Sequence, residues 1–118
     1  MDINKMIKTL REHPESRKIG MIATHLGIVR GNSRGGGKVT HVEVAFDHEK
    51  IREIITHAKE LDGVIEVLID TKDGRLKVGD AIMAVAVAGD IRENVFAALI
   101  QTVDRLKAEA SKKKELFI

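Results

Sequence analysis

The 118-residue chain has no cysteine, no tryptophan and no tyrosine, and only three phenylalanines and one proline. The absence of cysteine excludes disulfides, thiolate metal ligands, cysteine nucleophiles and iron–sulfur clusters held by cysteine. The small number of aromatic rings argues against the stacking surfaces with which many domains hold single-stranded nucleic acid. The hydrophobic core is therefore expected to consist of aliphatic side chains.

The chain also lacks a large excess of positive or negative charge. Lysine and arginine number 20 against 18 aspartates and glutamates, which gives a formal net charge of +2. So mild a balance predicts no nucleic-acid partner, and a basic site can arise only by local clustering. No apolar run approaches the roughly 20 residues of a membrane span, and residues 1–17 lack the apolar stretch of a signal peptide. We therefore expect a cytoplasmic protein without a membrane contact.

The length fits a single domain over residues 1–118. Hydrophobic periodicity, caps and turn residues predict eight elements along the chain. The expected helices are residues 2–13, a helix between Asp47 and Gly63, and a last helix that starts with the capping-box pair Asp90 and Glu93 and continues to Lys114; the expected strands are residues 19–30, 38–46, 64–69, 75–78 and 81–87. Hairpins mixed with helices predict an α+β fold with a mainly antiparallel sheet and three helices. Residues 81–87 are almost entirely apolar, which predicts the central strand.

A glycine-rich segment, residues 31–37, connects the first two expected strands. It misses the spacing of a nucleotide-binding P-loop by one residue, and a strand rather than a helix follows it, so we exclude that function. Two interpretations remain. The segment is a mobile hairpin loop, or the cations Arg30, Arg34 and Lys38 around it close over an anionic ligand.

Histidine is scattered along the chain. The five histidines are His13, His25, His41, His48 and His57. None is paired at the i, i+4 spacing of a helical metal site. We therefore expect core or surface histidines and no metal site.

The C-terminal segment carries a spacing of cations that allows two interpretations. Lys107, Ser111 and Lys114 stand at i, i+4 and i+7, so in a continuous helix they share one face, with the two lysines about 10 Å apart. In the first interpretation, they form a solvated basic helix end that complements the helix dipole. Alternatively, the two lysines hold a phosphate or supply a nitrogen nucleophile.

Several short motifs, taken together in their order and intervals, resemble one family. They are Gly27-Ile-Val-Arg30 before the glycine-rich loop, Gly74-Arg-Leu-Lys-Val-Gly79-Asp80, Arg92 with Phe96, Asp104-Arg-Leu-Lys107, and Lys114-Glu115 at the spacing of the family's Lys-Lys-Glu or Lys-Arg-Glu ending. The family is the large, catalytic subunit of molybdopterin synthase. The resemblance covers residues 20–115 and leaves residues 1–17 as an additional N-terminal helix.

The resemblance implies an α/β-hammerhead homodimer with one small subunit docked on each protomer, and thus a heterotetramer. Family members are sulfur transferases of molybdenum cofactor biosynthesis. A ubiquitin-like small subunit delivers sulfur as a thiocarboxylate on its C-terminal Gly-Gly. The large subunit binds cyclic pyranopterin monophosphate and directs formation of the molybdopterin dithiolene, with no cofactor of its own.

The resemblance also assigns site residues. Lys107 and Lys114 match the family's two catalytic lysines, and Arg30 and Arg92 match arginines that bind the substrate. Their neighbours Val29, Ile91 and Glu115 are expected at the same substrate site. A pterin that carries a phosphate requires a cationic pocket, and arginine supplies bidentate contacts to phosphate.

The chain departs from the family pattern at two of these places. Residues 111–113 read Ser-Lys-Lys where the family has a Pro-hydrophobic-Trp run, and Ile91 replaces a histidine. These differences support an alternative function, in which a non-catalytic family member acts as a dimeric pterin- or partner-binding module. A third possibility is an unrelated small α+β ligand-binding domain.

Overall fold

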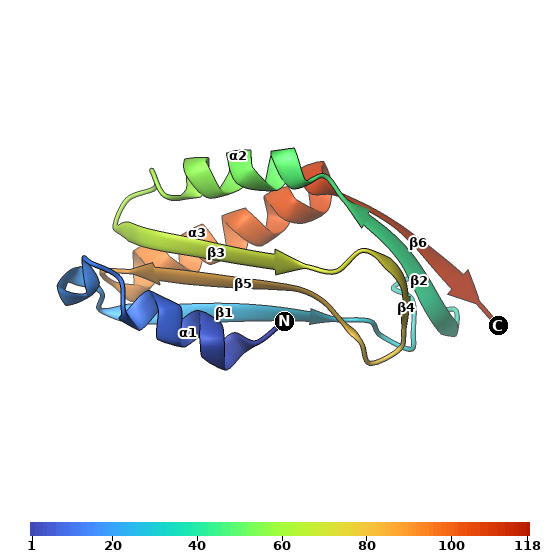
Figure 1. Cartoon of the computed structure of the whole chain (residues 1–118). Coiled ribbons are helices and arrows are strands. Elements are labelled where there is room, and N and C mark those ends of the chain that lie inside the picture. The colour runs from blue at the N-terminus through green and yellow to red at the C-terminus, as the bar shows by residue number, and fades with distance from the viewer.

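The computed structural model describes residues 1–118 and contains three α-helices and six β-strands (Figure 1). The helices are α1 (Ile3–Arg11), α2 (His48–Ala58) and α3 (Arg92–Arg105), with a 3-10 turn, η1 (Ser16–Lys18), and a π-helical turn, η2 (Leu106–Ala110). The strands are β1 (Met21–Ile28), β2 (Val39–Phe46), β3 (Val64–Thr71), β4 (Gly74–Lys77), β5 (Ala81–Gly89) and β6 (Ser111–Phe117). None of the helices has the length and apolar character needed to cross a membrane.

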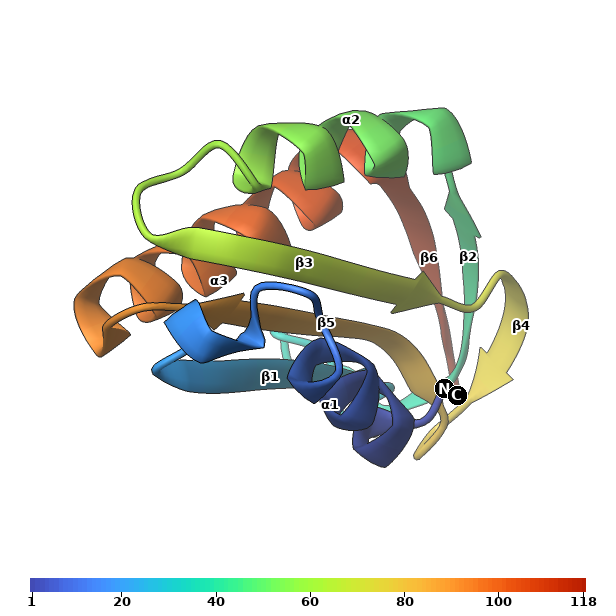
Figure 2. The same ribbon diagram turned by 60° about the vertical axis from the view of Figure 1, so that its left-hand side comes forward.

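The strands form two antiparallel sheets of three strands each. The first has the order β1-β5-β3 and the second the order β4-β2-β6. The second sheet extends from one end of the first as an arm, and β2 and β6 run side by side along it (Figures 1 and 2). The predicted hammerhead-like α+β class with antiparallel strands and three helices is confirmed, but the strands are divided between two sheets.

β5 is the central strand of the first sheet, as its apolar sequence predicts. Successive side chains of a strand point to opposite faces, so β5 is covered on both sides. Ala84, Ala86 and Ala88 face α1, where they pack with Met6 and Leu10. The small alanine side chains leave room for the larger side chains of this helix.

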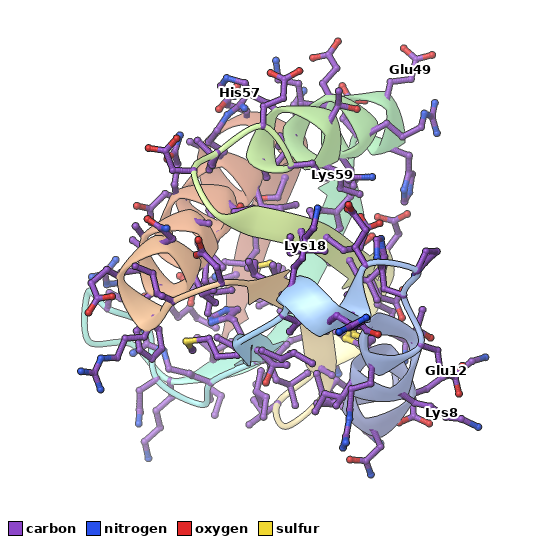
Figure 3. All side chains as sticks on the ribbon, turned by 90° about the vertical axis from the view of Figure 1, so that its left-hand side faces the viewer. Lys8, Glu12, Lys18, Glu49, His57 and Lys59 are labelled. Carbon is purple, nitrogen blue, oxygen red and sulfur yellow. The ribbon has the colours of Figure 1, made fainter.

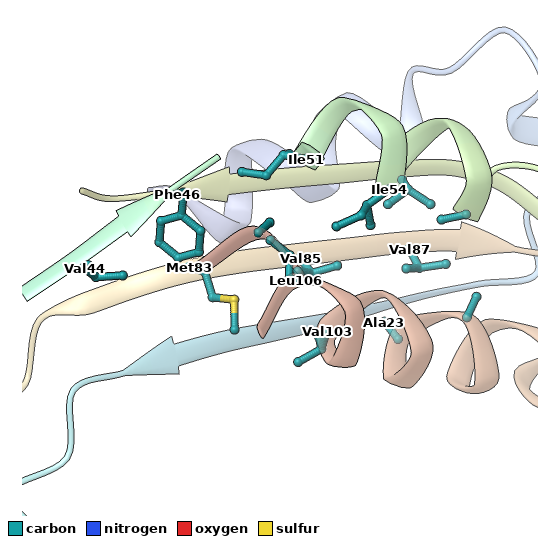
Figure 4. Packing of buried hydrophobic residues seen from close by; sticks show 14 of the residues in the cluster. Ala23, Val44, Phe46, Ile51, Ile54, Met83, Val85, Val87, Val103 and Leu106 are labelled. Atoms are coloured by element: carbon teal, nitrogen blue, oxygen red, sulfur yellow. The ribbon is translucent and has the colours of Figure 1, made fainter. Parts of the chain in front are cut away.

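The opposite face of β5 forms the main core with α2 and α3. Met83, Val85 and Val87 belong to a cluster of 19 buried residues that also contains Ile54 of α2 and Leu106 of η2 (Figure 4). Phe46 and Val44 of β2 belong to the same cluster, so the arm is packed onto the core at its base. The core is aliphatic apart from Phe46, in agreement with the composition.

Charged side chains cover the outer sides of the helices. Lys8 and Glu12 on and just after α1, and Glu49 and His57 on α2, point away from the sheets (Figure 3). The apolar stripes of these two helices therefore face the sheet, as their sequence periodicity predicts.

Two of the predicted helix caps are confirmed and one is wrong. Asp2 accepts a hydrogen bond from the Lys5 amide at 3.0 Å, and Asp47 accepts one from the Lys50 amide at 3.1 Å. The expected capping box of α3 does not form. Instead, Asp90 accepts hydrogen bonds from the Ile91 amide and the Asn94 side chain, and Glu93 forms an ion pair with Arg92.

The predicted last helix is too long. α3 ends at Arg105, η2 follows, and residues 111–117 form β6 against β2. The local sequence is rich in helix-forming lysine, alanine and glutamate, but pairing with a distant strand overrides that preference. Lys107, Ser111 and Lys114 therefore do not share a helix face, which corrects that expectation.

Candidate functional site

A groove of about 750 Å³ lies between the arm and the end of β1. Three regions that are distant in the sequence form its walls: residues 25–30, the inner face of β2, and the segment from η2 into β6. Half of its 16 lining residues are hydrophobic. The charged ones are Arg30, Arg34, Lys107, Lys113 and Glu115.

Strand alternation decides which residues of β6 face the groove. Phe46, Val44 and Val42 of β2 are buried and pair with Ser111, Lys113 and Glu115. These three residues of β6 therefore lie on the inner face and line the groove. Lys112 and Lys114 point to the outer face, where Lys114 pairs with the exposed Glu43.

The glycine-rich loop closes one end of the groove. Within the loop, the Ser33 amide donates a hydrogen bond to the Gly37 carbonyl, and the Gly36 amide donates one to the Ser33 carbonyl. The Ser33 hydroxyl donates a hydrogen bond to Glu115 on β6 at 3.0 Å. The loop thus holds Arg34 over the groove beside the Glu115 end of β6.

The other end of the groove is defined by η2. The Ser111 hydroxyl donates a hydrogen bond to the Lys107 carbonyl at 3.1 Å, which ties the π-helical turn to the start of β6. Single π-helical turns are frequent at functional sites, because they reorient the side chains of an otherwise regular helix. Along β6, the groove therefore passes from Glu115 at the loop end through Lys113 to Ser111 and Lys107.

The groove concentrates positive charge that the protein itself does not neutralise. Arg30, Arg34, Lys107 and Lys113 form no ion pair. The single carboxylate, Glu115, leaves an excess of three positive charges among these five side chains. Several unpaired cations that converge on one concave surface favour an anionic ligand.

His25 of β1 is the remaining titratable residue of the groove. Burial and the nearby Lys107 ammonium lower the pKa of His25 below its ordinary value of 6.5. Both causes disfavour the charged imidazolium, so the ring is neutral at neutral pH.

Four of the residues that the sequence analysis assigned to the site line this groove. Arg30, Lys107 and Glu115 contribute charged side chains, and Val29 contributes a buried apolar one. Val29 also fixes the start of the loop, because its amide and carbonyl bond to Asp80 and Gly79.

The other three assigned residues lie elsewhere. Ile91, 53% exposed, is the N-cap of α3, and the exposed Arg92 next to it forms an ion pair with Glu93. With a rise of 1.5 Å per residue, Arg92 lies about 20 Å along the helix axis from Lys107. Lys114 faces the outer side of the arm, so the expectation that it lies beside Lys107 is wrong.

Two groove residues, His25 and Lys113, are absent from the site predicted from the sequence, and Arg34 enters it only as one of the cations around the loop. A helical C-terminal segment places Lys113 off the face of Lys107, and no spacing distinguishes His25 from the other histidines. The Lys-Lys-Glu ending was the available signal: read as Lys113-Lys114-Glu115, it places its first lysine and its glutamate on the same side of an extended strand.

The side chains of the structure do not form a metal site. The structure contains no group of three or more histidine, aspartate or glutamate residues that could hold a metal ion. The groove itself offers one histidine and one carboxylate among four cations, a donor set unsuited to a divalent metal.

The two antiparallel sheets, the three helices and the groove define a member of the hammerhead-like class to which molybdopterin synthase structures belong. A MoaE protein from Burkholderia multivorans superposes with a TM-score of 0.78 at 28% identity, covering 100% of this chain and 82% of the other. A complex of subunits 1 and 2 of the molybdopterin-converting factor from Helicobacter pylori contains a chain with the same fold. The TM-score is 0.73 at 17% identity, with 99% of this chain and 80% of the other covered.

The model of the MoaE protein family matches residues 1–109, and the chain belongs to this family. A curated relative, the molybdopterin synthase catalytic subunit of Ralstonia nicotianae, is 32% identical over 97 residues. The match covers 79% of this chain and 54% of the relative, so the chain spans about half the length of that protein.

Proposed function

We propose that this protein is the catalytic subunit of a molybdopterin synthase. In this function it transfers sulfur from a thiocarboxylated, ubiquitin-like small subunit to cyclic pyranopterin monophosphate and thereby forms the molybdopterin dithiolene. The observation that carries the proposal is the groove, in which four unpaired cations converge in a member of the MoaE family. The relative from Ralstonia nicotianae, which is named a molybdopterin synthase catalytic subunit, supports the same reaction.

The two ends of the groove suit two different parts of this reaction. Arg30 and Arg34 at the loop end can bind the phosphate of the pterin through charge-assisted, bidentate hydrogen bonds. The half-apolar wall formed by Val42, Val44 and Phe46 offers a surface for the fused rings. The pterin then extends toward Lys113 and Lys107.

The lysine end is where we place the sulfur transfer. A thiocarboxylate is an anion, and attack at or by this group shifts negative charge between its sulfur and oxygen atoms. The ammonium groups of Lys107 and Lys113 are positioned to stabilise that charge as it develops. Lys113 takes the role that the sequence analysis gave to Lys114, because only the inward-facing lysine of β6 reaches the groove.

The small subunit is proposed as the partner that supplies the sulfur. The Helicobacter pylori structure holds subunits 1 and 2 of its converting factor together, which supports a two-subunit assembly for proteins of this fold. A C-terminal tail that ends in Gly-Gly is narrow enough to enter a groove between two sheets.

A homodimer is proposed because Arg92 is too far from Lys107 to bind the same ligand within one protomer. If both residues act on one substrate, Arg92 comes from a second copy. The exposed apolar residues near it, Ile91, Phe96 and Ile100, provide a surface that such a contact would cover. Light scattering is expected to show a dimer at micromolar concentration, and a monomer would contradict this assembly.

Reconstitution tests the proposed function. The purified protein is mixed with a thiocarboxylated small subunit and cyclic pyranopterin monophosphate, and molybdopterin is measured. We expect product with the wild-type chain and a loss of at least tenfold with Lys107→Ala, while Lys112→Ala on the outer face remains active. Full activity of Lys107→Ala would contradict the assignment. Tight pterin binding without any product in the wild-type chain would favour the alternative of a non-catalytic pterin-binding module.

A further inference from the structure

His25 is the one histidine that lines the groove. It lies on the groove side of β1, opposite Val85 of β5. Its Nε2 atom is enclosed and makes no hydrogen bond. An ordinary structural histidine has its buried nitrogen paired, since an unpaired one costs free energy.

The second ring nitrogen faces the groove. Nδ1 of His25 makes no hydrogen bond either, and it is not enclosed, so it opens onto the groove. Protonation of Nδ1 would give an imidazolium beside the Lys107 ammonium, and burial further disfavours that charge, so the neutral ring is the stable form at neutral pH. Nδ1 accepts a proton in the neutral tautomer that carries its hydrogen on Nε2.

The charges around His25 leave it as the only effective base of the groove. The other basic side chains of the groove are cations and have no free electron pair that could accept a proton: Arg30, Arg34, Lys107 and Lys113. Glu115 already accepts the Ser33 hydroxyl hydrogen bond. The His25 imidazole, which is neutral at neutral pH, is the one uncharged proton acceptor among the titratable side chains of the groove.

We propose that His25 is the general base of the lysine end of the groove and takes a proton from the water that releases the small subunit. The proposal rests on the function proposed above. Once the sulfur is bonded to the pterin, a thioester joins the pterin to the carbonyl carbon of the small subunit. The water oxygen bonds to that carbon, and the carbon–sulfur bond breaks with its electron pair left on sulfur. One water proton goes to Nδ1 of His25, and the carboxylic acid formed loses its own proton to solvent.

The first test is the pH dependence of a single turnover with a thiocarboxylated small subunit and cyclic pyranopterin monophosphate. The wild-type rate is expected to fall on the acid side with an apparent pKa below 6.5. His25→Gln and His25→Phe are expected to lose at least tenfold in rate and to lack this acid limb. The matched control is His41→Gln, because Nδ1 of His41 is also enclosed and unpaired, but His41 does not line the groove. It is expected to keep both the rate and the acid limb.

A second readout does not require activity. The ring signals of His25, followed by NMR titration, are expected to titrate at higher pH in Lys107→Ala than in the wild-type protein, because a neighbouring positive charge is removed. An unchanged titration would overturn the proposed environment of His25. If the wild-type chain forms no molybdopterin, the proposed function is wrong and the role of His25 fails with it. If the wild-type chain is active and His25→Gln keeps its rate and its acid limb, only the role of His25 is wrong.

Discussion

The register of β6 makes a sharp distinction between two adjacent lysines. Lys113 lies inside the groove beside Val44, whereas Lys114 lies on the outer face opposite Glu43. Replacing Lys113 by alanine removes a hydrogen-bonding cation from the end of the groove toward which we expect the bound pterin to extend. A hydrogen bond to a charged group is worth about 1.5–3 kcal/mol, so Lys113→Ala should weaken binding of cyclic pyranopterin monophosphate by roughly 10- to 150-fold. Lys114→Ala removes an equal charge outside the groove and should change the free energy of binding by less than about 0.5 kcal/mol.

Isothermal titration calorimetry with the pterin measures both variants under the same conditions. Thermal unfolding provides the control for folding, since both lysines are exposed and neither change should alter stability appreciably. A loss for Lys114→Ala as large as that for Lys113→Ala would refute the argument from strand register. Equal losses that disappear at high salt would indicate a diffuse electrostatic attraction instead of a contact in the groove.

Three further predictions concern the elements that hold the groove in place. Leu106→Ala should destabilise the protein by about 2–5 kcal/mol in urea unfolding, because Leu106 is 0% exposed at the junction of η2 and the core. Lys8→Ala, on the exposed outer side of α1, should change stability little. Arg105 and Lys50 hold the pKa of Glu109 at about 2, below its ordinary 4.5, so its contribution to stability is present above pH 4.5 and is lost as the pH falls toward 2. Glu109→Gln should therefore reduce stability at pH 6 more than at pH 3, and an equal loss at both would contradict this. Ser33→Ala should speed hydrogen exchange in residues 31–37 because it removes the bond to Glu115, while Ser16→Ala in η1 should leave that exchange unchanged.

Local sequence signals were sufficient for much of the fold. The caps Asp2 and Asp47 precede apolar stripes of helical period, and both helices begin where these residues predict. The apolar run of β5 predicts a strand buried on both faces, because a half-exposed strand would alternate. Such signals depend on neighbours within a few residues.

Local sequence signals could not predict the C-terminal strand. Residues 111–115 read Ser-Lys-Lys-Lys-Glu, which carries no alternation and no glycine or proline to end the preceding helix. Their strand conformation is set by β2, about 70 residues earlier in the chain. A change from helix to strand reverses which lysine faces inward, so Lys113 lines the groove in place of Lys114, which both the helical spacing and the family resemblance favoured. Local sequence signals could not predict the groove either, because it brings together Arg34, His25 and Lys113 from three distant segments.

The proposed sulfur transfer can be followed with an isotope. A small subunit whose thiocarboxylate carries a heavy sulfur isotope is mixed with cyclic pyranopterin monophosphate and this protein, and the product is analysed by mass spectrometry. We expect both sulfur atoms of the dithiolene to carry the label with the wild-type chain, and Lys107→Ala to yield little or no labelled product while it still folds. A wild-type chain that binds the pterin and the small subunit but transfers no labelled sulfur would show that this protein is not the sulfur transferase proposed here.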